Sequence, residues 1–332
     1  MTHSTDHRNE PFLSTGAGMV LACLAACLLW GSAFPCVKIG YALFDIDSAD
    51  VASIVLFAGV RFLISGSLVV AGMSIARRRP YVPARGDWRQ AAELSIFQTI
   101  LQYLCFYVGL SRCAGVTSSI IEASNAFLIV LLAVYAFRTE SMTWRKAIGC
   151  VLGFAGVLQV SLAGSAAGGL SFRLDGEGLV FLSTFAAAMS SNLSKRYSRD
   201  HDPVLLSAWQ FIIGGAVLAA AGLAMGGHVA PAEGANPVAA IALLVYLGFI
   251  SAAAYSLWSA TLAVNDVSHV AVFGFMNPVF GAILSVLLLG EGNVLRPAVA
   301  LGSLALVSIG IVIVNRPNVP LPHERLRQRL RG

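Results

Sequence analysis

Long blocks of apolar residues, rather than alternating apolar and polar positions, make up most of this chain. Each block is about 20 residues long, and short polar segments separate the blocks. A helix rises ~1.5 Å per residue and the hydrocarbon layer of a bilayer is ~30 Å thick, so one block can cross a membrane as a helix. The predicted spans are 17–38, 51–75, 90–111, 116–137, 143–163, 177–197, 204–226, 237–262, 267–289 and 295–315. The pattern therefore predicts an all-α membrane protein with ten transmembrane helices.

Composition and charge agree with a membrane location. Of the 332 residues, 57% are hydrophobic and 12% are charged, and this charged share is about half that of a typical soluble domain. The pI of about 9.0 would also suit a nucleic-acid-binding protein, but the basic residues lie mainly between the apolar blocks, where membrane topology explains them. We therefore expect membrane lipid and a small-molecule substrate as partners, and no nucleic acid. The sequence leaves the oligomeric state open and is compatible with a monomer.

The distribution of basic residues predicts the orientation in the membrane. Seventeen Lys and Arg residues fall on the side of the termini, four fall on the opposite side, and Arg61 lies inside a span. Cytoplasmic loops carry the excess of positive charge, so both termini are predicted to be cytoplasmic. The first block follows the polar tail MTHSTDHRNEP and is longer than the apolar region of a cleaved signal peptide, so we expect a retained helix.

Two stretches of the sequence resemble each other. The first is AGVTSSIIEASNAFLIVLLAVYAFRTES at 114–141, and the second is NDVSHVAVFGFMNPVFGAILSVLLLGEG at 265–292. At an offset of 151 or 152 residues, the matched pairs are Val116 and Val267, Asn125 and Asn277, and Glu140 and Glu291. Self-similarity at this distance predicts two repeats of five helices each.

An odd number of helices per repeat forces the second repeat to enter the membrane from the opposite side, so the repeats are inverted. Inverted repeats are an architecture of secondary transporters that work by alternating access. The predicted parts of the chain are a cytoplasmic tail at 1–16, a first five-helix repeat at 17–163, an external linker at 164–176, a second five-helix repeat at 177–315 and a basic cytoplasmic tail at 316–332.

Short motifs in both repeats are similar to those of a known family. The first helix ends in WGSAFPCVK, the second contains AGVRF, and the fourth helices of the two repeats end in FRTES and LGEG. In order and spacing, these motifs resemble the EamA-type drug/metabolite transporter superfamily, and most of all its bacterial amino-acid and aromatic metabolite exporters. The resemblance implies a ten-helix basket around a central cavity lined mainly by helices 1, 3, 4, 6, 8 and 9.

The function that this resemblance implies is secondary transport: export of amino acids, including aromatic or apolar ones, and related metabolites from a bacterial cytoplasm across the inner membrane. A multidrug or cation exporter and a sugar-nucleotide or phosphate antiporter of the same superfamily are the alternatives. Small multidrug members use a glutamate in the first helix, and CLAACLLWGSAFPCVKIG contains no carboxylate. The family's proline in the fourth helix is kept as Pro278 in the second repeat, whereas the first repeat has Ala126.

The sequence argues against an enzyme. An intramembrane protease would need paired aspartates, a Ser/His couple or a zinc site within the membrane, and no apolar block has an aspartate at its centre. Six cysteines lie in or beside the apolar blocks without the spacing of a metal or redox site, so helix packing explains them. We expect no catalytic residue, metal site or cofactor.

Two charged residues lie deep within predicted spans. Arg61, in VLFAGVRFLISGSLVV, is ten residues from the outer end of its span, or ~15 Å deep by helical rise. Glu122 is six residues from the outer end of another span, or ~9 Å deep. Charges at such depth are costly unless they are paired or hydrated. We predict an Arg61–Glu122 pair that locks the second helix to the fourth; the alternative is that Arg61 contacts a substrate carboxylate.

Polar and aromatic residues within the spans are the candidates for substrate binding. The candidates are Trp30, Gln98, Gln102, Tyr103, Ser119, Asn125, Tyr255, Trp258 and Asn277, and Tyr107 and Trp209 are further aromatic residues of interest. Uncharged hydrogen-bonding side chains suit a zwitterion, and Trp30 and Trp258 could stack on an apolar substrate. Polar side chains also hold membrane helices together, so packing is the alternative role for each.

Other positions are candidates for proton coupling or bending. His269, near the cytoplasmic start of the ninth span, is a candidate proton carrier, with a hydrogen-bonded interface histidine as the alternative. Pro35 removes a hydrogen bond to the carbonyl of Gly31. Gly31, Pro35 and Pro278 are therefore candidate hinges, and a static kink is the alternative interpretation.

Overall fold

Helices make up most of the structure, a computed structural model that describes residues 12–47, 49–110, 112, 121–163, 173–289 and 297–316. No strand occurs in these ranges, and a helix lies in each segment that was predicted to span the membrane. The prediction of an all-α protein is confirmed. The two predicted tails and the linker at 164–176 lie largely outside the described residues, and Ser119 lies outside them altogether.

The helical segments follow one another with short connections. In the first half of the chain they are α1 (Gly16–Leu43), α2 (Val51–Arg77), α3 (Asp87–Ser95), α4 (Gln102–Leu110), α6 (Asn125–Leu131) and α7 (Trp144–Ala163). In the second half they are α8 (Glu177–Tyr197), α9 (Pro203–Ala224), α10 (Pro237–Val264), α11 (Val267–Ala271), α12 (Met276–Leu289) and α13 (Pro297–Asn315). The segments Ile96–Leu101 and Leu132–Ala136 are π-helical, and Phe12–Ser14 and Val272–Phe275 are 3₁₀-helical.

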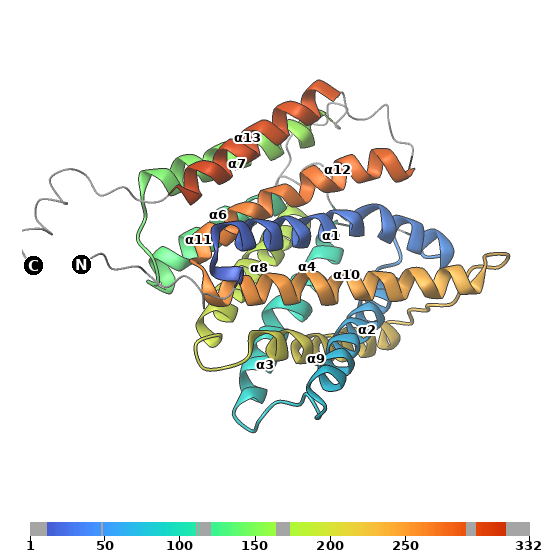
Figure 1. The fold of residues 1–332 in the computed structure, drawn as a ribbon. Coiled ribbons are helices and arrows are strands. Elements are labelled where there is room, and N and C mark those ends of the chain that lie inside the picture. The colour runs from blue at the N-terminus through green and yellow to red at the C-terminus, as the bar shows by residue number, and fades with distance from the viewer. Residues whose placement is uncertain are drawn as a thin grey trace, which may run out of the picture.

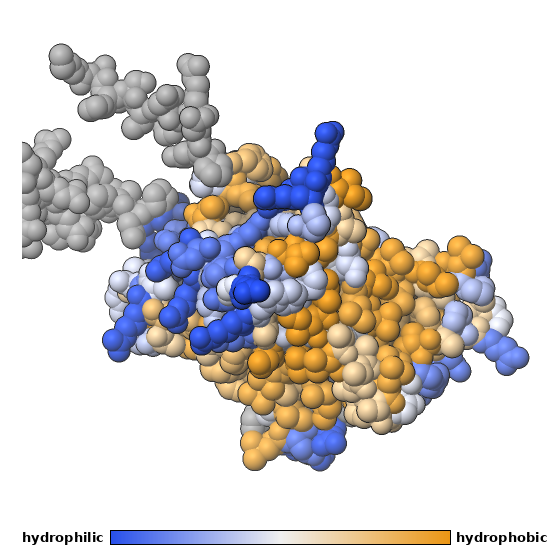
Figure 2. Space-filling model, turned by 90° about the horizontal axis from the view of Figure 1, so that it is seen from below, coloured by the Kyte–Doolittle hydropathy of each residue, from blue (hydrophilic) through white to orange (hydrophobic). Residues whose placement is uncertain are grey.

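Several of these helices are long and apolar enough to cross a membrane. The long ones are Gly16–Leu43, Val51–Arg77, Asp87–Gly109, Pro203–Ala224 and Pro237–Val264, and shorter apolar helices occupy Ile121–Ala136, Val267–Gly281 and Leu301–Asn315. Large apolar side chains such as Leu223, Phe249 and Val312 are exposed on the outside of the bundle. Figure 2 shows a broad hydrophobic area on one face, with a large group of hydrophilic residues toward one end and smaller groups at the other margins. The protein is therefore a multi-pass membrane protein.

Polar residues just before the apolar blocks explain where the helices begin. The Asp202 carboxylate accepts hydrogen bonds from two backbone N–H groups in the first turn of α9, at 3.0 and 3.3 Å. The Asn236 side chain does the same for α10, at 2.9 and 3.3 Å. Pro203 and Pro237 follow at the first helical positions, where a missing N–H costs no hydrogen bond.

The helices pack in pairs that join distant parts of the sequence. In Figure 1, α7 and α13 run side by side along one edge of the bundle, and α2 packs against α9 toward the opposite edge. Between these edges, α1 packs against α10 and α12, while α8 packs against α4 and α6. Each of these contacts joins a helix of the first half of the chain to a helix of the second half. The two halves are therefore interlocked.

Glycines let the paired backbones approach closely. A Cβ atom at Gly59 of α2 would lie 2.3 Å from the backbone nitrogen of Ala219 in α9, and one at Gly222 of α9 would lie 2.6 Å from the backbone of α2. A Cβ atom at Gly149 of α7 would lie 2.8 Å from the carbonyl oxygen of Gly310 in α13. Small residues are typical of helix interfaces in membranes, because helices surrounded by lipid gain little from burying apolar side chains against one another.

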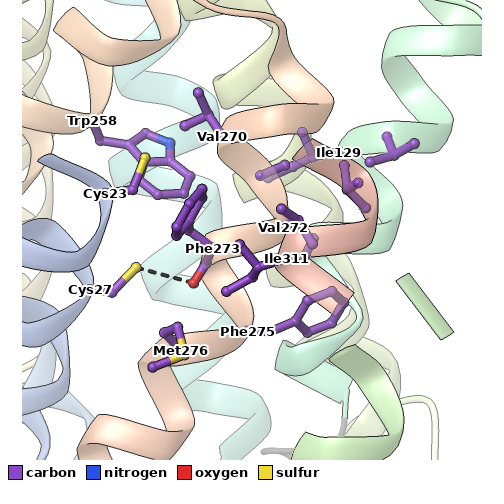
Figure 3. Close-up of a cluster of buried hydrophobic side chains, with 14 of the residues drawn as sticks. Cys23, Cys27, Ile129, Trp258, Val270, Val272, Phe273, Phe275, Met276 and Ile311 are labelled. Atoms are coloured by element: carbon purple, nitrogen blue, oxygen red, sulfur yellow. Dashed lines mark hydrogen bonds between the residues drawn. The ribbon is translucent and has the colours of Figure 1, made fainter. Parts of the chain in front are cut away.

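A large buried cluster of apolar side chains lies where α1, α10 and the α11–α12 region meet. Figure 3 shows Cys23 and Cys27 of α1 beside Trp258 and Phe273, and the Cys27 thiol donates a hydrogen bond to the Phe273 carbonyl oxygen at 3.2 Å. The described cysteines are free and buried, namely Cys23, Cys27, Cys36, Cys105 and Cys150. Packing therefore accounts for these five side chains.

Gly59→Ala is expected to lower the free energy of unfolding by roughly 1–3 kcal/mol, because the added methyl group would push α2 away from α9. Gly72→Ala in the same helix is the matched control, since a Cβ atom there meets nothing within 4 Å. The control should leave stability unchanged or raise it by up to ~1 kcal/mol. Thermal unfolding in detergent measures both variants, and equal melting temperatures would contradict the close packing of α2 on α9.

Candidate functional site

Three aromatic side chains lie in contact where α1 meets α10. The ring centroid of Trp30 lies 4.8 Å from that of Tyr255 and 5.2 Å from that of Trp258. Tyr255 and Trp258 are three residues apart on α10 and therefore lie on one face of the helix. Trp30 and Tyr255 are half-buried, and Trp258 is buried. The structure thus brings these three sequence-predicted candidates together.

The ring contacts continue into α2, α4 and α9. The ring centroid of Phe211 lies 4.9 Å from that of Tyr255 and 5.1 Å from that of Phe62, and Phe62 in turn lies 4.5 Å from Tyr103. The hydroxyl groups of Tyr103 and Tyr255 are 3.3 Å apart, within hydrogen-bond distance. We call this group the aromatic cluster, and its members are Trp30, Phe62, Tyr103, Phe211, Tyr255 and Trp258.

The aromatic cluster has a polar edge made of hydroxyl and amide groups. The Gln102 side chain lies close to the Tyr255 hydroxyl. One turn after Tyr103 on α4, Tyr107 lies close to Tyr41 of α1, and the Tyr103 and Tyr107 ring centroids are 6.1 Å apart. Three helices therefore place hydroxyl groups near one another inside the bundle.

Arg61 meets α10 rather than the fourth predicted span. Its side chain is buried and donates two hydrogen bonds to Oγ of Ser251, from Nε at 3.2 Å and from Nη2 at 3.0 Å. The predicted ion pair with Glu122 is wrong, since no ion pair among the described residues joins the two side chains. That prediction used depth alone, and depth does not say which helices are neighbours. In the bundle α2 packs against α9 and α10.

Glu122 lies on the same polar edge without touching Arg61. Its side chain is half-buried in the helical turn before α6, and no hydrogen bond or ion pair from another described residue reaches its carboxylate. Three tyrosines, Tyr103, Tyr107 and Tyr255, lie within electrostatic range of both Arg61 and Glu122. One positive and one negative side chain therefore act electrostatically on the same three tyrosines.

Four of the candidate residues carry a buried polar atom with no hydrogen-bond partner in the part of the chain that the structure describes. These atoms are Trp30 Nε1, Gln102 Oε1, Asn125 Oδ1 and Asn277 Oδ1. Leaving a buried polar atom unpaired costs about 1–3 kcal/mol, and native proteins satisfy most such atoms with protein groups or ordered water. Other residues outside the site, such as Asn192 and Ser303, also carry unpaired buried polar atoms, so an unpaired atom alone does not mark a binding residue.

The matched asparagines lie at matching interruptions of two helices. α6 begins at Asn125 after a turn, and α12, which contains Asn277, follows the 3₁₀ segment Val272–Phe275. Pro278 lies in the first turn of α12, where a missing N–H is tolerated. The first half has Ala126 at the matching position and is interrupted as well. The interruption therefore does not depend on the proline.

The remaining candidates lie apart from the aromatic cluster. Gln98 is buried in the first π-helical segment, and no described hydrogen bond links it to the cluster. The backbone carbonyl of His269, in α11, accepts a hydrogen bond from the end of α13 at 3.3 Å. Gly31 packs on α12, since a Cβ atom there would lie 2.6 Å from Phe280 Cβ. Pro35 lies inside α1, which continues through it as one helix.

Sequence reasoning missed four residues of this region: Tyr41, Phe62, Phe211 and Ser251. Ser251 and Tyr255 are four residues apart, so the helical period places the serine on the face of α10 that carries a predicted candidate. That spacing could have identified Ser251. The phenylalanines are indistinguishable in sequence from the lipid-facing apolar residues around them, so no comparable signal existed for them.

A second polar group, the Glu140 network, joins the two halves at the end of the bundle where basic residues concentrate. Glu140 Oε2 lies 2.7 Å from Lys146 Nζ, and the carboxylate also accepts hydrogen bonds from the Ser268 hydroxyl and, at 3.1 Å, from its backbone N–H. The Glu140 and Lys146 side chains are only 6% and 12% exposed. Burial alone would raise the pKa of the Glu140 carboxyl, but the hydrogen bonds from Lys146 and Ser268 outweigh burial and lower that pKa below 4.5, its ordinary value.

A comparison with known proteins identifies the family. The model of the EamA-like transporter family matches the chain twice, at 17–162 and at 174–316. The chain belongs to the EamA-like transporter family. This EamA-family protein is therefore a membrane transporter and not an enzyme. Among its described residues, no group of three or more His, Cys, Asp or Glu side chains is placed to hold a metal ion.

Individual relatives agree with this assignment. An uncharacterized protein of Pseudomonas aeruginosa is 31% identical over 265 residues, which cover 80% of this chain and 85% of the relative. A protein of Streptantibioticus cattleyicolor named a probable terminal-alkyne amino-acid exporter is 24% identical, over 90% of this chain and 93% of its own. One solved crystal structure has the same fold, with a TM-score of 0.73 and 18% identity, over 96% of this chain and 100% of that one.

Lys146→Met is expected to lower the free energy of unfolding by roughly 3–5 kcal/mol, because the buried Glu140 carboxylate would lose its charged partner. Adding Glu140→Gln to the same protein should restore much of this loss. Arg89→Met is the control, since the Arg89 side chain is 84% exposed in its pair with Glu93 and such a pair contributes less than ~1 kcal/mol. Melting temperatures of the purified proteins measure these effects. Similar shifts for Lys146→Met and Arg89→Met would show that the Glu140 network adds little to stability.

Proposed function

We propose that this EamA-family protein is a secondary transporter that exports amino acids with aromatic or apolar side chains, and related metabolites, from a bacterial cytoplasm by alternating access. The observation that carries the proposal is the aromatic cluster with its polar edge. Aromatic faces suit an apolar side chain, and unpaired hydrogen-bonding atoms beside them suit the charged ends of an amino acid. The amino-acid exporter named among the relatives supports the same substrate class.

The proposal includes a binding cavity inside the bundle. Trp30, Gln102, Tyr103, Tyr107 and Tyr255 come from α1, α4 and α10, and each keeps some accessible surface although it contacts other residues of the site. Side chains packed fully against protein or one another would lose this surface. A ligand-sized space bordered by these residues would account for their partial exposure.

Alternating access rests on the proposed architecture of ten helices in two inverted repeats. The family model matches the two halves of the chain separately. The packing also fits two equivalent repeats. The second helices of the repeats, α2 and α9, pack against each other, and so do the fifth helices, α7 and α13. The first helix of one repeat, α1, packs against α10 and α12, and the first helix of the other, α8, packs against the equivalent helices α4 and α6. The interruptions at Asn125 and near Asn277 correspond in the same way.

The Glu140 network supplies a contact that alternating access would have to break. It ties the loop after the second π-helical segment to Ser268 at the start of α11, which belongs to the other repeat. The excess of basic residues on this side, seventeen against four, supports a cytoplasmic position for it by the positive-inside rule. In this arrangement the network holds the two repeats together at the cytoplasmic end, and release of substrate would occur at the opposite end.

A cation exporter is the second candidate, and one observation favours it. The half-buried Glu122 carboxylate lies within electrostatic range of three tyrosines, and a carboxylate beside aromatic rings attracts organic cations. A sugar-nucleotide or phosphate antiporter is less well supported. It would need several basic residues at depth, whereas Arg61 is the only Lys or Arg at the centre of a predicted span.

Counterflow in liposomes tests the proposed function. Vesicles loaded with one unlabelled amino acid should accelerate uptake of the labelled amino acid, and phenylalanine, leucine and other apolar members should exchange faster than charged ones. An imposed pH gradient shows whether protons are coupled to exchange. Organic cations form the second substrate panel. Saturable exchange of cations but of no amino acid would replace the first candidate by the second.

Trp30→Ala is expected to raise the half-saturation concentration of phenylalanine exchange about tenfold, because an aromatic contact and its buried area contribute on the order of 1–3 kcal/mol. Trp144→Ala is the matched control, since Trp144 is 84% exposed at the start of α7. The control should exchange phenylalanine as the unaltered protein does. If both variants behave alike, the aromatic cluster is not the binding site.

A further inference from the structure

Arg61 and Glu122 are opposite charges inside one bundle that do not neutralise each other. Arg61 is buried and bonds to Ser251, a neutral side chain. Glu122 receives no hydrogen bond or ion pair from the other described residues. A charge within a membrane costs several kcal/mol when it is neither paired nor hydrated. Among the described residues, each of these side chains therefore has no ion-pair partner of opposite charge.

Arg61 has hydrogen-bonding capacity left for such a partner. A guanidinium carries N–H donors on Nε and on both Nη atoms, and the bonds to Ser251 involve only Nε and Nη2. The Nη1 group has no described hydrogen bond, and it is not among the completely buried atoms that lack a partner. Since Ser251 holds one side of the planar group, the other donors are oriented by it. Parallel N–H groups of this kind bind a carboxylate well.

The three tyrosines connect the two charges in space. Tyr103, Tyr107 and Tyr255 each lie within electrostatic range of both Arg61 and Glu122, and all three are half-buried. The tyrosines keep some accessible surface, and two of them, Tyr103 and Tyr255, belong to the aromatic cluster. A ligand at this surface would meet a positive side chain, a negative side chain and apolar rings at once.

We propose that Arg61 and Glu122 hold the two ends of a zwitterion, with the substrate carboxylate at Arg61 and the substrate ammonium at Glu122. This inference rests on the proposed amino-acid export and defines the substrate class of that site as an amino acid whose amino and carboxyl groups are both free. The apolar side chain of the substrate lies against Trp30 and Tyr255. The tyrosine rings add cation–π attraction for the ammonium group.

Ligands with a single charge fit this site poorly. A carboxylate without an amine would leave Glu122 unpaired and close to a second anion, and an amine without a carboxylate would leave Arg61 without its partner. Removing one member of a buried hydrogen-bonded charge pair weakens binding by roughly 30-fold to several thousand-fold in protein interfaces. The site should therefore discriminate between an amino acid and its two truncated analogues, independently of the size of the side chain.

Competition against labelled phenylalanine counterflow measures this discrimination. The two competitors are 2-phenylethylamine, which lacks the carboxylate, and 3-phenylpropanoate, which lacks the ammonium; both keep the aromatic side chain. For the unaltered protein, we expect each to inhibit about 100-fold more weakly than unlabelled phenylalanine. Equal inhibition by phenylalanine and phenylethylamine would overturn the role of Arg61, and equal inhibition by phenylalanine and phenylpropanoate would overturn that of Glu122.

Two variants assign the discrimination to the two side chains. Arg61→Gln should weaken inhibition by phenylalanine about 100-fold and leave inhibition by phenylethylamine unchanged, because only the carboxylate contact is lost. Glu122→Gln should weaken inhibition by phenylalanine by a similar factor, and inhibition by phenylpropanoate should stay unchanged or become stronger. Arg61→Lys and Glu122→Asp keep the charges, so they should retain the order of the three ligands even where affinity falls.

The outcomes separate this inference from the proposed function. If phenylalanine exchanges but Arg61→Gln and Glu122→Gln weaken all three ligands equally, the two side chains are structural and the zwitterion site is wrong, while amino-acid export stands. If the unaltered protein exchanges no amino acid, the proposed function itself fails. Gel filtration and melting temperature identify a variant that does not fold. In that case, the charge-conserving variants and the competition series on the unaltered protein decide whether Arg61 and Glu122 bind the substrate.

Discussion

A lipid bilayer offers the polypeptide backbone no hydrogen-bond partner, and the rest of this structure depends on that constraint. Each segment within the membrane must satisfy its own N–H and C=O groups, so it forms a helix. The departures from regular α-helix, at Ile96–Leu101, Leu132–Ala136 and Val272–Phe275, lie within helical segments that pack inside the bundle. Irregular backbone is tolerated at membrane depth where protein surrounds it or where it borders a cavity, and π-helical turns often occur at functional sites.

The same constraint explains how the helices are divided between scaffold and site. Apolar side chains gain little by leaving lipid for another helix, so close association relies on small residues. Gly59 and Gly222 provide this for α2 and α9, and Gly149 and Gly310 provide it for α7 and α13. These pairs form the two edges of the bundle in Figure 1. α1, α4 and α10, which lie between the edges, carry four of the six members of the aromatic cluster, and α2 and α9 contribute Phe62 and Phe211.

Polar groups inside such a bundle are informative because burying a polar group that lacks a partner costs free energy. The Glu140 network meets that cost with an ion pair and hydrogen bonds from both halves of the chain, as a structural contact should. Arg61, Glu122, Asn125 and Asn277 do not: the charges lack opposite charges and the amide oxygens lack donors among the described residues. The proposed substrate site is built on this contrast between a satisfied polar network and unsatisfied polar groups.

The sequence by itself determined the helices, their approximate ends, the family resemblance and the depth of Arg61 and Glu122, because hydropathy, helix length and charge are properties of residues read along one chain. It also identified Trp30, Tyr103, Tyr255 and Trp258 as candidates, since tryptophan and tyrosine combine an aromatic ring with a hydrogen-bonding group. The partners of those residues were decided only by the tertiary structure. Arg61 meets Ser251 instead of Glu122, and Phe62 and Phe211 join the aromatic cluster, because the rotation of each helix and its choice of neighbours are set by packing between residues far apart in the sequence.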